Sequence, residues 1–166
     1  DIWHYSIEKA VSNKINITLA TDLDQLREKW VDNPSRYITS VNTDQNGEHI
    51  AITARGRVFV VPLKAGRSVD FTDQKDVRFR NATFSSDGKQ VIALSDESGE
   101  FEFVSMPANG IGEYKNISKD GTVLRYAGVP SPDGKWLAYD DLEQHMYVLD
   151  IATGINNRIT TKKEGI

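Results

Sequence analysis

The chain has 166 residues, of which 39% are hydrophobic and 27% are charged, a composition typical of globular proteins. Its 20 Lys and Arg against 24 Asp and Glu give a net charge of −4, which excludes the strong basic field of nucleic-acid-binding proteins. The sequence contains no run of about 18 apolar residues, so it predicts no membrane-spanning helix. The absence of cysteine excludes disulfides, thiol catalysis and zinc–thiolate sites.

The first nineteen residues predict a pair of strands. The chain opens on Asp1, with no initiator Met and no basic region before an apolar stretch, so we expect an excised or processed piece without a signal peptide. Residues 2–10 align with residues 146–154, which lie in the outer part of a later sheet unit. We therefore expect residues 1–19 to be the two outer strands of a preceding unit whose inner strands are missing.

Residues 20–36 contain the helical candidate of the sequence. Thr21 can cap a helix, with Asp24 three positions later as a short capping box. The pair Asn33–Pro34 would end it. Three apolar residues at helical spacing would share one face: Leu23, Leu26 and Trp30. We expect a short helical linker here.

Three similar turn motifs follow at nearly regular spacing. Each is a four-residue motif that ends in glycine, and the glycines are 41 and 46 residues apart: DQNG ending at Gly47, SSDG at Gly88 and SPDG at Gly134. A period of about 40–45 residues is typical of the four-stranded blades of β-propellers. The sequence therefore predicts three blades, at residues 37–76, 77–122 and 123–166.

The third motif shows the turn chemistry most fully. Pro132 presets a φ of about −65°, Asp133 takes the third turn position, and Gly134 supplies the positive φ that returns the chain to an antiparallel partner. The first two motifs lack the proline. Alternating β-branched and aromatic residues on either side favour strands. The expected strands are 48–53, 58–61, 89–94, 101–104, 135–139 and 146–149, with polar outer strands such as 156–160.

These elements are too few to close a ring. At about 42 residues a blade, even four blades would need nearly the whole chain, and the linker and the half unit take part of it. The predicted fold class is therefore all-β: a partial β-propeller with about three four-stranded antiparallel blades, half a blade and one short helix. Blades bury their faces against neighbours, so an open arc exposes two apolar faces, and we expect self-association.

The spacing of reactive residues predicts no catalytic or metal site. Ser86 and Lys89 match Ser-x-x-Lys, but the pair spans a β-turn and lacks the helical geometry that this chemistry needs. The acidic stretches 96–100 and 140–143 fit no calcium-loop template. The histidines are scattered, with no pair at metal-ligand spacing: His4, His49 and His145. We expect no catalytic residue, metal or cofactor.

Beyond the generic repeat, the chain contains six more specific stretches: LREKWVDNP at 26–34, TARGRVFV at 53–60, RNATF at 80–84, ALSDESGE at 93–100, PANG at 107–110 and GVPSPDGKW at 128–136. These stretches resemble the second propeller of tricorn-type proteases, and the likeness covers roughly residues 20–160. The resemblance implies a longer parent with two propellers, a PDZ-like module and a serine peptidase core that cuts oligopeptides. No residue of this chain matches the catalytic motifs of that family.

The resemblance implies a non-catalytic segment that scaffolds the peptidase core and gates or binds peptides. Its expected partners are peptides and other domains of the same chain, with no nucleic acid and no membrane. The compartment stays open, with an exported location slightly favoured over the cytoplasm. Two alternatives stay open as well. One is a TolB-type propeller that serves as a protein-interaction module, and the other, disfavoured by the scattered histidines, is a sugar-acting propeller enzyme.

One set of basic residues is the candidate site. The innermost strand of each blade lines the channel of a propeller, and its start lies near one mouth. Arginine suits a peptide carboxylate because its planar fork binds two oxygens at once. The structural alternative is that these residues form salt bridges between blades or solubilise the mouth. The predicted peptide-binding rim consists of Arg36, Arg78, Arg80 and Arg125.

Overall fold

The computed structural model describes residues 2–18, 27, 29–71 and 76–159. The chain divides into two compact units, residues 1–33 and 34–166. The first unit is a hairpin in which β1 (Ile2–Ser6) pairs antiparallel with β2 (Val11–Ile15). This agrees with the predicted pair of strands at the start of the chain, and every residue of β2 is exposed.

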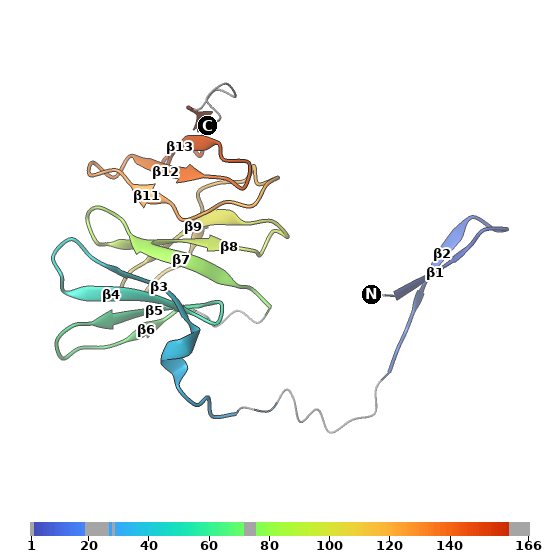
Figure 1. Ribbon diagram of the computed structural model, residues 1–166, viewed down its shortest axis with the longest axis horizontal. Helices are drawn as coiled ribbons and strands as arrows, with labels where there is room; N and C mark the ends of the chain where they lie inside the picture. The colour runs from blue at the N-terminus through green and yellow to red at the C-terminus, as the bar shows by residue number, and fades with distance from the viewer. Residues whose placement is uncertain (1, 19–26, 28, 72–75, 160–166) are drawn as a thin grey trace. The chain divides into compact units, whose positions relative to one another are not determined.

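The second unit contains three four-stranded antiparallel sheets, which we call blades 1, 2 and 3 (Figure 1). In each blade the strands are neighbours in chain order, so the first strand lies at one edge and the fourth at the other. The predicted all-β class with three four-stranded blades is confirmed. The division of the chain into linker and blades at the residues given above stays a prediction. Blade 1 contains β3 (Ile38–Thr43), β4 (His49–Ala54), β5 (Arg57–Pro62) and β6 (Val69–Asp70); blade 2 contains β7 (Phe79–Phe84), β8 (Gln90–Ser95), β9 (Glu102–Pro107) and β10 (Lys115–Asn116); blade 3 contains β11 (Val129–Pro130), β12 (Trp136–Asp140), β13 (Met146–Asp150) and β14 (Asn156–Arg158).

The turns between the first and second strands form as their chemistry predicts. Gly47, Gly88 and Gly134 have φ values of 66°, 70° and 71°, a region that glycine enters without steric cost. In the second and third motifs the aspartate also accepts a hydrogen bond from the amide two residues on, at 3.0 Å for Asp87 and 3.1 Å for Asp133. These carboxylates hold the chain reversal in place.

Blade 2 is buried on both faces because successive side chains along its strands point alternately toward blade 1 and toward blade 3. In β8, Val91 and Ala93 pack against blade 1, whereas Ile92 and Leu94 pack against blade 3. Figure 1 shows the three sheets stacked in chain order, with β8 in the middle one. A strand that is buried on both sides has a nearly continuous run of apolar residues in its sequence, and β8 has such a run.

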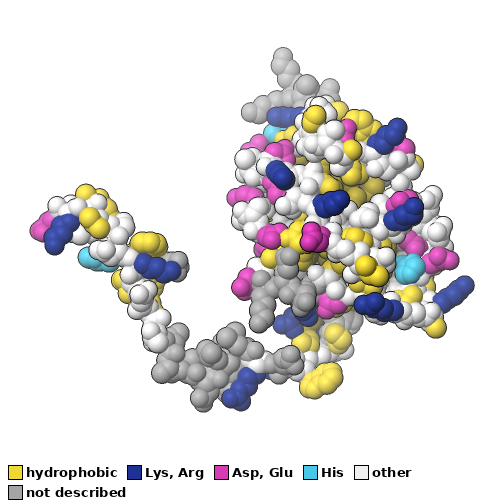
Figure 2. Space-filling view, turned by 180° about the vertical axis from the view of Figure 1, so that it is seen from behind, with side chains coloured by type: hydrophobic (Ala, Val, Ile, Leu, Met, Phe, Trp, Pro, Cys, Tyr) yellow, Lys and Arg dark blue, Asp and Glu magenta, His cyan; other side chains and the backbone are white. Residues whose placement is uncertain are grey.

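Blades 1 and 3 each leave one face open. In blade 1, Val41 is 53% exposed, and in blade 3 Trp136 and Met146 are 38% and 49% exposed. On the face drawn in Figure 2, acidic, basic and hydrophobic side chains are interspersed. The expected self-association rests on the two apolar faces and stays a prediction.

The helix expected in the linker falls mostly on residues 19–26 and 28, which lie outside the described part of the chain. Residues 29–33 are described and are not helical. A short 3-10 helix, η2, instead occupies Pro34–Tyr37, directly before β3. Proline suits the first turn of a helix because its missing N–H has no partner there, so Pro34, which was expected to end the linker helix, starts η2. Among the described residues, no helix has the length and apolarity needed to cross a bilayer.

Candidate functional site

The four predicted arginines lie at the same end of their blades. Arg36 is in η2, just ahead of β3, and Arg78 and Arg80 flank the start of β7. Arg125 forms an isolated bridge with Asp141, at the turn between β12 and β13. This is the end at which the second strand of each blade turns into the third. The surroundings of the four side chains nevertheless differ.

Arg36, Arg78 and Arg80 are exposed. The Arg80 guanidinium lies 4.8 Å from the centre of the Phe101 ring, a cation–π contact. The amide of Arg78 donates to Asp96 Oδ1 at 2.7 Å, which ties the start of β7 to the turn after β8. We group Arg36, Arg78 and Arg80 as the exposed arginines.

Arg125 is buried, with 6% of its surface exposed. Its Nη1 donates to Glu102 Oε2 at 3.1 Å and to Ser118 Oγ at 2.9 Å, and its Nη2 donates to Asp120 Oδ1 at 2.6 Å. Glu102 belongs to β9 of blade 2, so the ion pair joins two blades. Arg125 therefore makes the contact that the structural alternative describes, a salt bridge between blades.

The sequence reasoning missed Arg55. It forms the turn between β4 and β5, at the same end of blade 1 as Arg36, and its φ is 53°. Its guanidinium carbon lies 5.1 Å from the centre of the Tyr37 ring. The sequence does carry a signal, because Arg55-Gly56 follows the second predicted strand of blade 1, but the alignment at the turn glycines places only the starts of the inner strands at the mouth.

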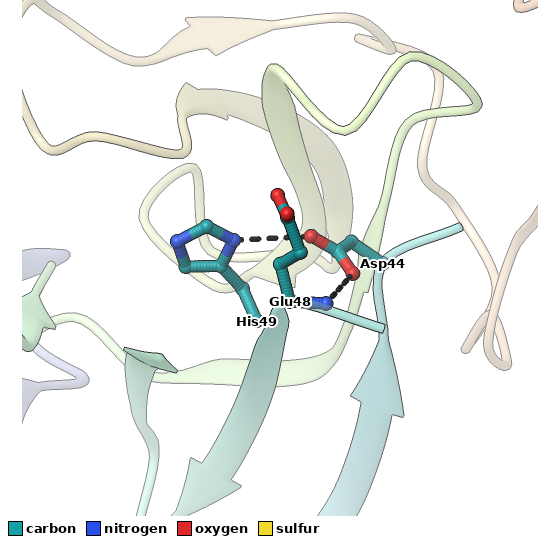
Figure 3. A group of neighbouring side chains, drawn as sticks. All are labelled: Asp44, Glu48 and His49. Atoms are coloured by element: carbon teal, nitrogen blue, oxygen red, sulfur yellow. Dashed lines mark hydrogen bonds and ion pairs between the residues drawn. The ribbon is translucent and has the colours of Figure 1, made fainter. Parts of the chain in front are cut away.

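Two further clusters bring a histidine beside carboxylates. In blade 1, Asp44 Oδ1 accepts from the Glu48 amide at 2.8 Å, and its Oδ2 lies 3.0 Å from His49 Nδ1. Figure 3 shows both contacts converging on the Asp44 carboxylate. Burial alone would raise the pKa of Asp44, but the hydrogen bonds from His49 and from the two backbone amides outweigh it and lower that pKa.

The second cluster, at the β12–β13 turn, has the same plan. Asp141 Oδ1 accepts from the His145 amide at 2.9 Å, and its Oδ2 lies 3.3 Å from His145 Nδ1. With Glu48 in the first cluster and Glu143 in the second, each offers three groups that could hold a metal ion. Both buried carboxylates are already occupied by hydrogen bonds that hold a turn, so we interpret the clusters as turn clamps.

Ser86 and Lys89 lie in the β7–β8 turn, as the pattern predicts. The Gly88 amide donates to the Ser85 carbonyl at 2.9 Å, and Asp87 Oδ1 accepts from the Ser85 hydroxyl and from the Lys89 amide. The chain reversal explains this motif without catalysis.

Comparison with known proteins agrees with this architecture. The chain matches no protein-family profile. It is 30% identical over 164 residues to a tricorn protease homolog of Saccharolobus solfataricus, a match that covers 99% of this chain and 14% of the relative. The chain thus spans about a seventh of the length of that relative.

Two solved structures are similar in fold. The crystal structure of the tricorn protease matches 98% of this chain and 15% of its own, with a TM-score of 0.69 and 16% identity. TolB from Acinetobacter baumannii matches 75% of this chain and 33% of its own, with a TM-score of 0.60 and 22% identity. Over 99% of its length, the chain is therefore similar to a propeller-like part of tricorn protease homologs.

Proposed function

We propose that this chain is a non-catalytic propeller segment that supports a serine peptidase core elsewhere in a longer protein and handles oligopeptides on their way to that core. The observation that carries the proposal is the sequence similarity to a tricorn protease homolog along 99% of the chain. The resemblance noted from the sequence implies the same role. The other domains of the parent are then its main partners.

The exposed arginines are the proposed peptide-binding rim. Arg36, Arg78 and Arg80 come from two neighbouring blades and share one end of them. A guanidinium stays charged at any physiological pH and can donate two parallel hydrogen bonds to a carboxylate. Such a rim would attract acidic side chains and the C-terminal carboxylate of a peptide. Arg125 is left out, because its guanidinium is already bound to Glu102, Ser118 and Asp120.

The rim is tested in the full-length parent with two peptides that differ only in a free or an amidated C-terminus. We expect the double variant Arg78→Ala/Arg80→Ala to lose roughly threefold or more in kcat/KM for the free-carboxylate peptide and to flatten its dependence on salt. Arg67→Ala is the matched control, because Arg67 is exposed and lies in the β5–β6 turn at the opposite end of blade 1. Unchanged turnover and salt dependence in the double variant would remove the rim.

The second candidate is a protein-interaction module of the TolB type. The fold match to TolB over 75% of the chain favours it. The two candidates differ outside these 166 residues, since a peptidase parent must carry a serine core and a PDZ-like module. The sequence of the parent gene distinguishes them, and a parent that consists of propeller blades alone favours the interaction module.

A further inference from the structure

The turn between β4 and β5 lies next to two other segments that carry exposed arginines. The register pairs Ile38 with Ala54, so the next residues outward, Tyr37 and Arg55, lie opposite each other. The guanidinium carbon of Arg55 is 5.1 Å from the centre of the Tyr37 ring. Arg36 directly precedes this tyrosine in η2. Arg55 therefore lies beside the segment that carries Arg36.

The same turn also contacts the start of blade 2. The Gly56 carbonyl accepts from the Phe79 amide at 2.8 Å. A Cβ at Gly56 would lie 3.2 Å from Cγ of Arg78, so the stem of the Arg78 side chain passes close to the glycine of the turn. One two-residue turn thus connects three exposed arginines, which we call the turn arginines: Arg36, Arg55 and Arg78.

The positive charge of the turn arginines has no direct counter-charge. Among the residues that the structure describes, none of the three guanidinium groups forms an ion pair. Asp96 accepts from the backbone amide of Arg78 and not from its side chain. By contrast, Arg57, two residues after Arg55, pairs with Asp70 at 4.0 Å. Neighbouring like charges repel each other, so in a chain with a net charge of −4 this group of cations favours a bound anion.

Arg55 has a backbone conformation that arginine rarely adopts. Its φ is 53°, and Gly56 follows with a φ of 77°, two positive values in a two-residue hairpin loop, as in a type I′ turn. Asn-Gly is the pair favoured at these positions, because asparagine tolerates a positive φ better than a long side chain does. An unfavourable conformation that persists in a structure points to a function for the residue that adopts it.

The ring contact leaves the hydrogen-bond donors of Arg55 available. A guanidinium that lies over an aromatic ring keeps its N–H groups in its own plane, where they can bind two carboxylate oxygens at once. The contact with Tyr37 also restricts the long side chain before any ligand arrives, so less conformational entropy is lost on binding. Arg55 is therefore the preorganised member of the turn arginines.

We propose that the turn arginines bind the end of a peptide whose last residue is aspartate or glutamate, through its C-terminal and its side-chain carboxylate together. This inference rests on the proposed peptide-handling function and names its substrate class. The three cations come from η2, from the β4–β5 turn and from the start of blade 2. Because the charge is spread over three segments, it suits two separate carboxylates better than one compact anion.

The test is a titration of the ¹⁵N-labelled 166-residue chain followed by NMR at constant ionic strength. N-acetyl-glutamate carries both carboxylates, N-acetyl-glutamine only the α-carboxylate, and N-acetyl-glutamate α-amide only the side-chain carboxylate. We expect saturable shifts of the backbone amides of Arg55, Gly56 and Arg78. N-acetyl-glutamate should bind about tenfold more tightly than either monoacid, the value of one hydrogen bond to a charged group. Equal affinity for the three probes contradicts the proposal, and so does the absence of local shifts.

Sodium phosphate distinguishes a peptide end from an inorganic oxyanion. We expect phosphate to bind more weakly than N-acetyl-glutamate, because its charge is concentrated on one group. Phosphate that binds as tightly and displaces N-acetyl-glutamate would assign the turn arginines to an inorganic oxyanion and overturn the proposal.

Substitutions in and beside the turn separate binding from folding. Arg55→Asn removes one guanidinium and places the favoured residue at the positive φ. It should weaken N-acetyl-glutamate binding about tenfold and raise the midpoint of thermal unfolding by about 2–4 °C. Arg57→Gln is the matched control, because Arg57 is close in sequence and already pairs with Asp70, and it should leave the affinity nearly unchanged. If Arg55→Asn lowers the midpoint and leaves the affinity unchanged, Arg55 only holds the turn and the proposal is wrong.

Failure of this inference and failure of the proposed function give different results. Unchanged turnover in the Arg78→Ala/Arg80→Ala parent would contradict the proposed function, whereas the binding data on the 166-residue chain do not depend on turnover. Equal affinity for the three N-acetylated probes, with the effect on turnover present, would contradict the preference for two carboxylates alone.

Discussion

The two junctions between blades are built differently. Between blades 1 and 2, the buried cluster is apolar and includes Val58, Phe79, Val91 and Met106. An uncharged polar contact lies there too, in which Asn42 Nδ2 donates to the Ala82 carbonyl at 2.8 Å. Between blades 2 and 3, an apolar cluster around Leu94, Phe103 and Leu137 lies beside the buried Arg125–Glu102 ion pair.

The two junctions show that one blade can pack on the next through two kinds of contact. Apolar contact has no preferred direction and depends on the area removed from water. A buried ion pair requires defined geometry, and its net contribution is small because desolvating both charges offsets their attraction. We therefore expect Arg125 to orient the second junction more than to stabilise it, and this junction should respond to single charge changes where the first does not.

The largest expected effect comes from breaking the ion pair on one side. Arg125→Ala leaves Glu102 buried without its cation, and the free energy of unfolding should fall by about 3–5 kcal/mol. The double variant Arg125→Met/Glu102→Leu should recover most of that loss, because it removes both charges at similar volume. Urea unfolding followed by circular dichroism measures both. A double variant no more stable than Arg125→Ala would contradict the view that the pair adds little net stability.

The matching change at the first junction is Met106→Ala. Met106 is 2% exposed in the apolar cluster, and its truncation should cost about 2–5 kcal/mol through lost contacts and the cavity left behind. The loss should be nearly the same at pH 5 and pH 7 in the same unfolding experiment. A loss that varied strongly with pH would mean that the first junction also depends on charged groups.

Two turn glycines give a smaller, paired effect. Gly47→Ala meets no atom within 4 Å, whereas a Cβ at Gly134 would lie 2.8 Å from Ser86 Oγ of the preceding blade. Both variants should lose about 1–2 kcal/mol because alanine is strained at positive φ. Gly134→Ala should lose slightly more, and Ser86→Ala should restore that excess alone. Thermal unfolding of the variants checks this, and no rescue would show that the turns of blades 2 and 3 do not touch.

Acid should affect the β12–β13 turn of blade 3 before it affects the apolar junction between blades 1 and 2. The pKa of Asp141 is below its ordinary value of about 3.8, because the His145 amide and Tyr147 outweigh the effect of burial. A lowered carboxyl pKa contributes stability above the unfolded value, and that contribution disappears as pH falls through the folded value. Asp141→Asn should therefore destabilise at pH 6, and the difference from the unchanged chain should shrink as pH falls below about 3.8, the ordinary pKa of the group, and through its lower folded pKa. A constant difference at all pH values would contradict this linkage.

The weakest expected effect is association through the open faces of the end blades. Light scattering should show dimers or larger species as concentration rises, because Val41 and Trp136 leave apolar surface exposed on blades 1 and 3. Val41→Lys and Trp136→Lys should each lower the association. A monomer at the highest soluble concentration would contradict the prediction.

The local elements were predictable because their signals lie within a few residues. Gly134 and the alternating residues of β12 specify a turn and a strand without reference to distant parts of the chain. The burial of Arg125 was not predictable, because its partner Glu102 lies 23 residues earlier in another blade. The His49–Asp44 contact was not predicted although only five residues separate the two, because metal-ligand spacing between histidines carries no information about a contact across a turn.

The sequence by itself determined the repeat, its strands and its turns, because each depends on a short-range pattern. It also determined the resemblance to a family of peptidases, which depends on the identity of short motifs. Stacking decided which arginine is exposed and which is buried, and it formed the polar pocket beside Arg125 from a connection, a turn and an edge strand. Burial and the pairing of charges depend on neighbours brought together by the fold, and the one-dimensional pattern does not contain those distances.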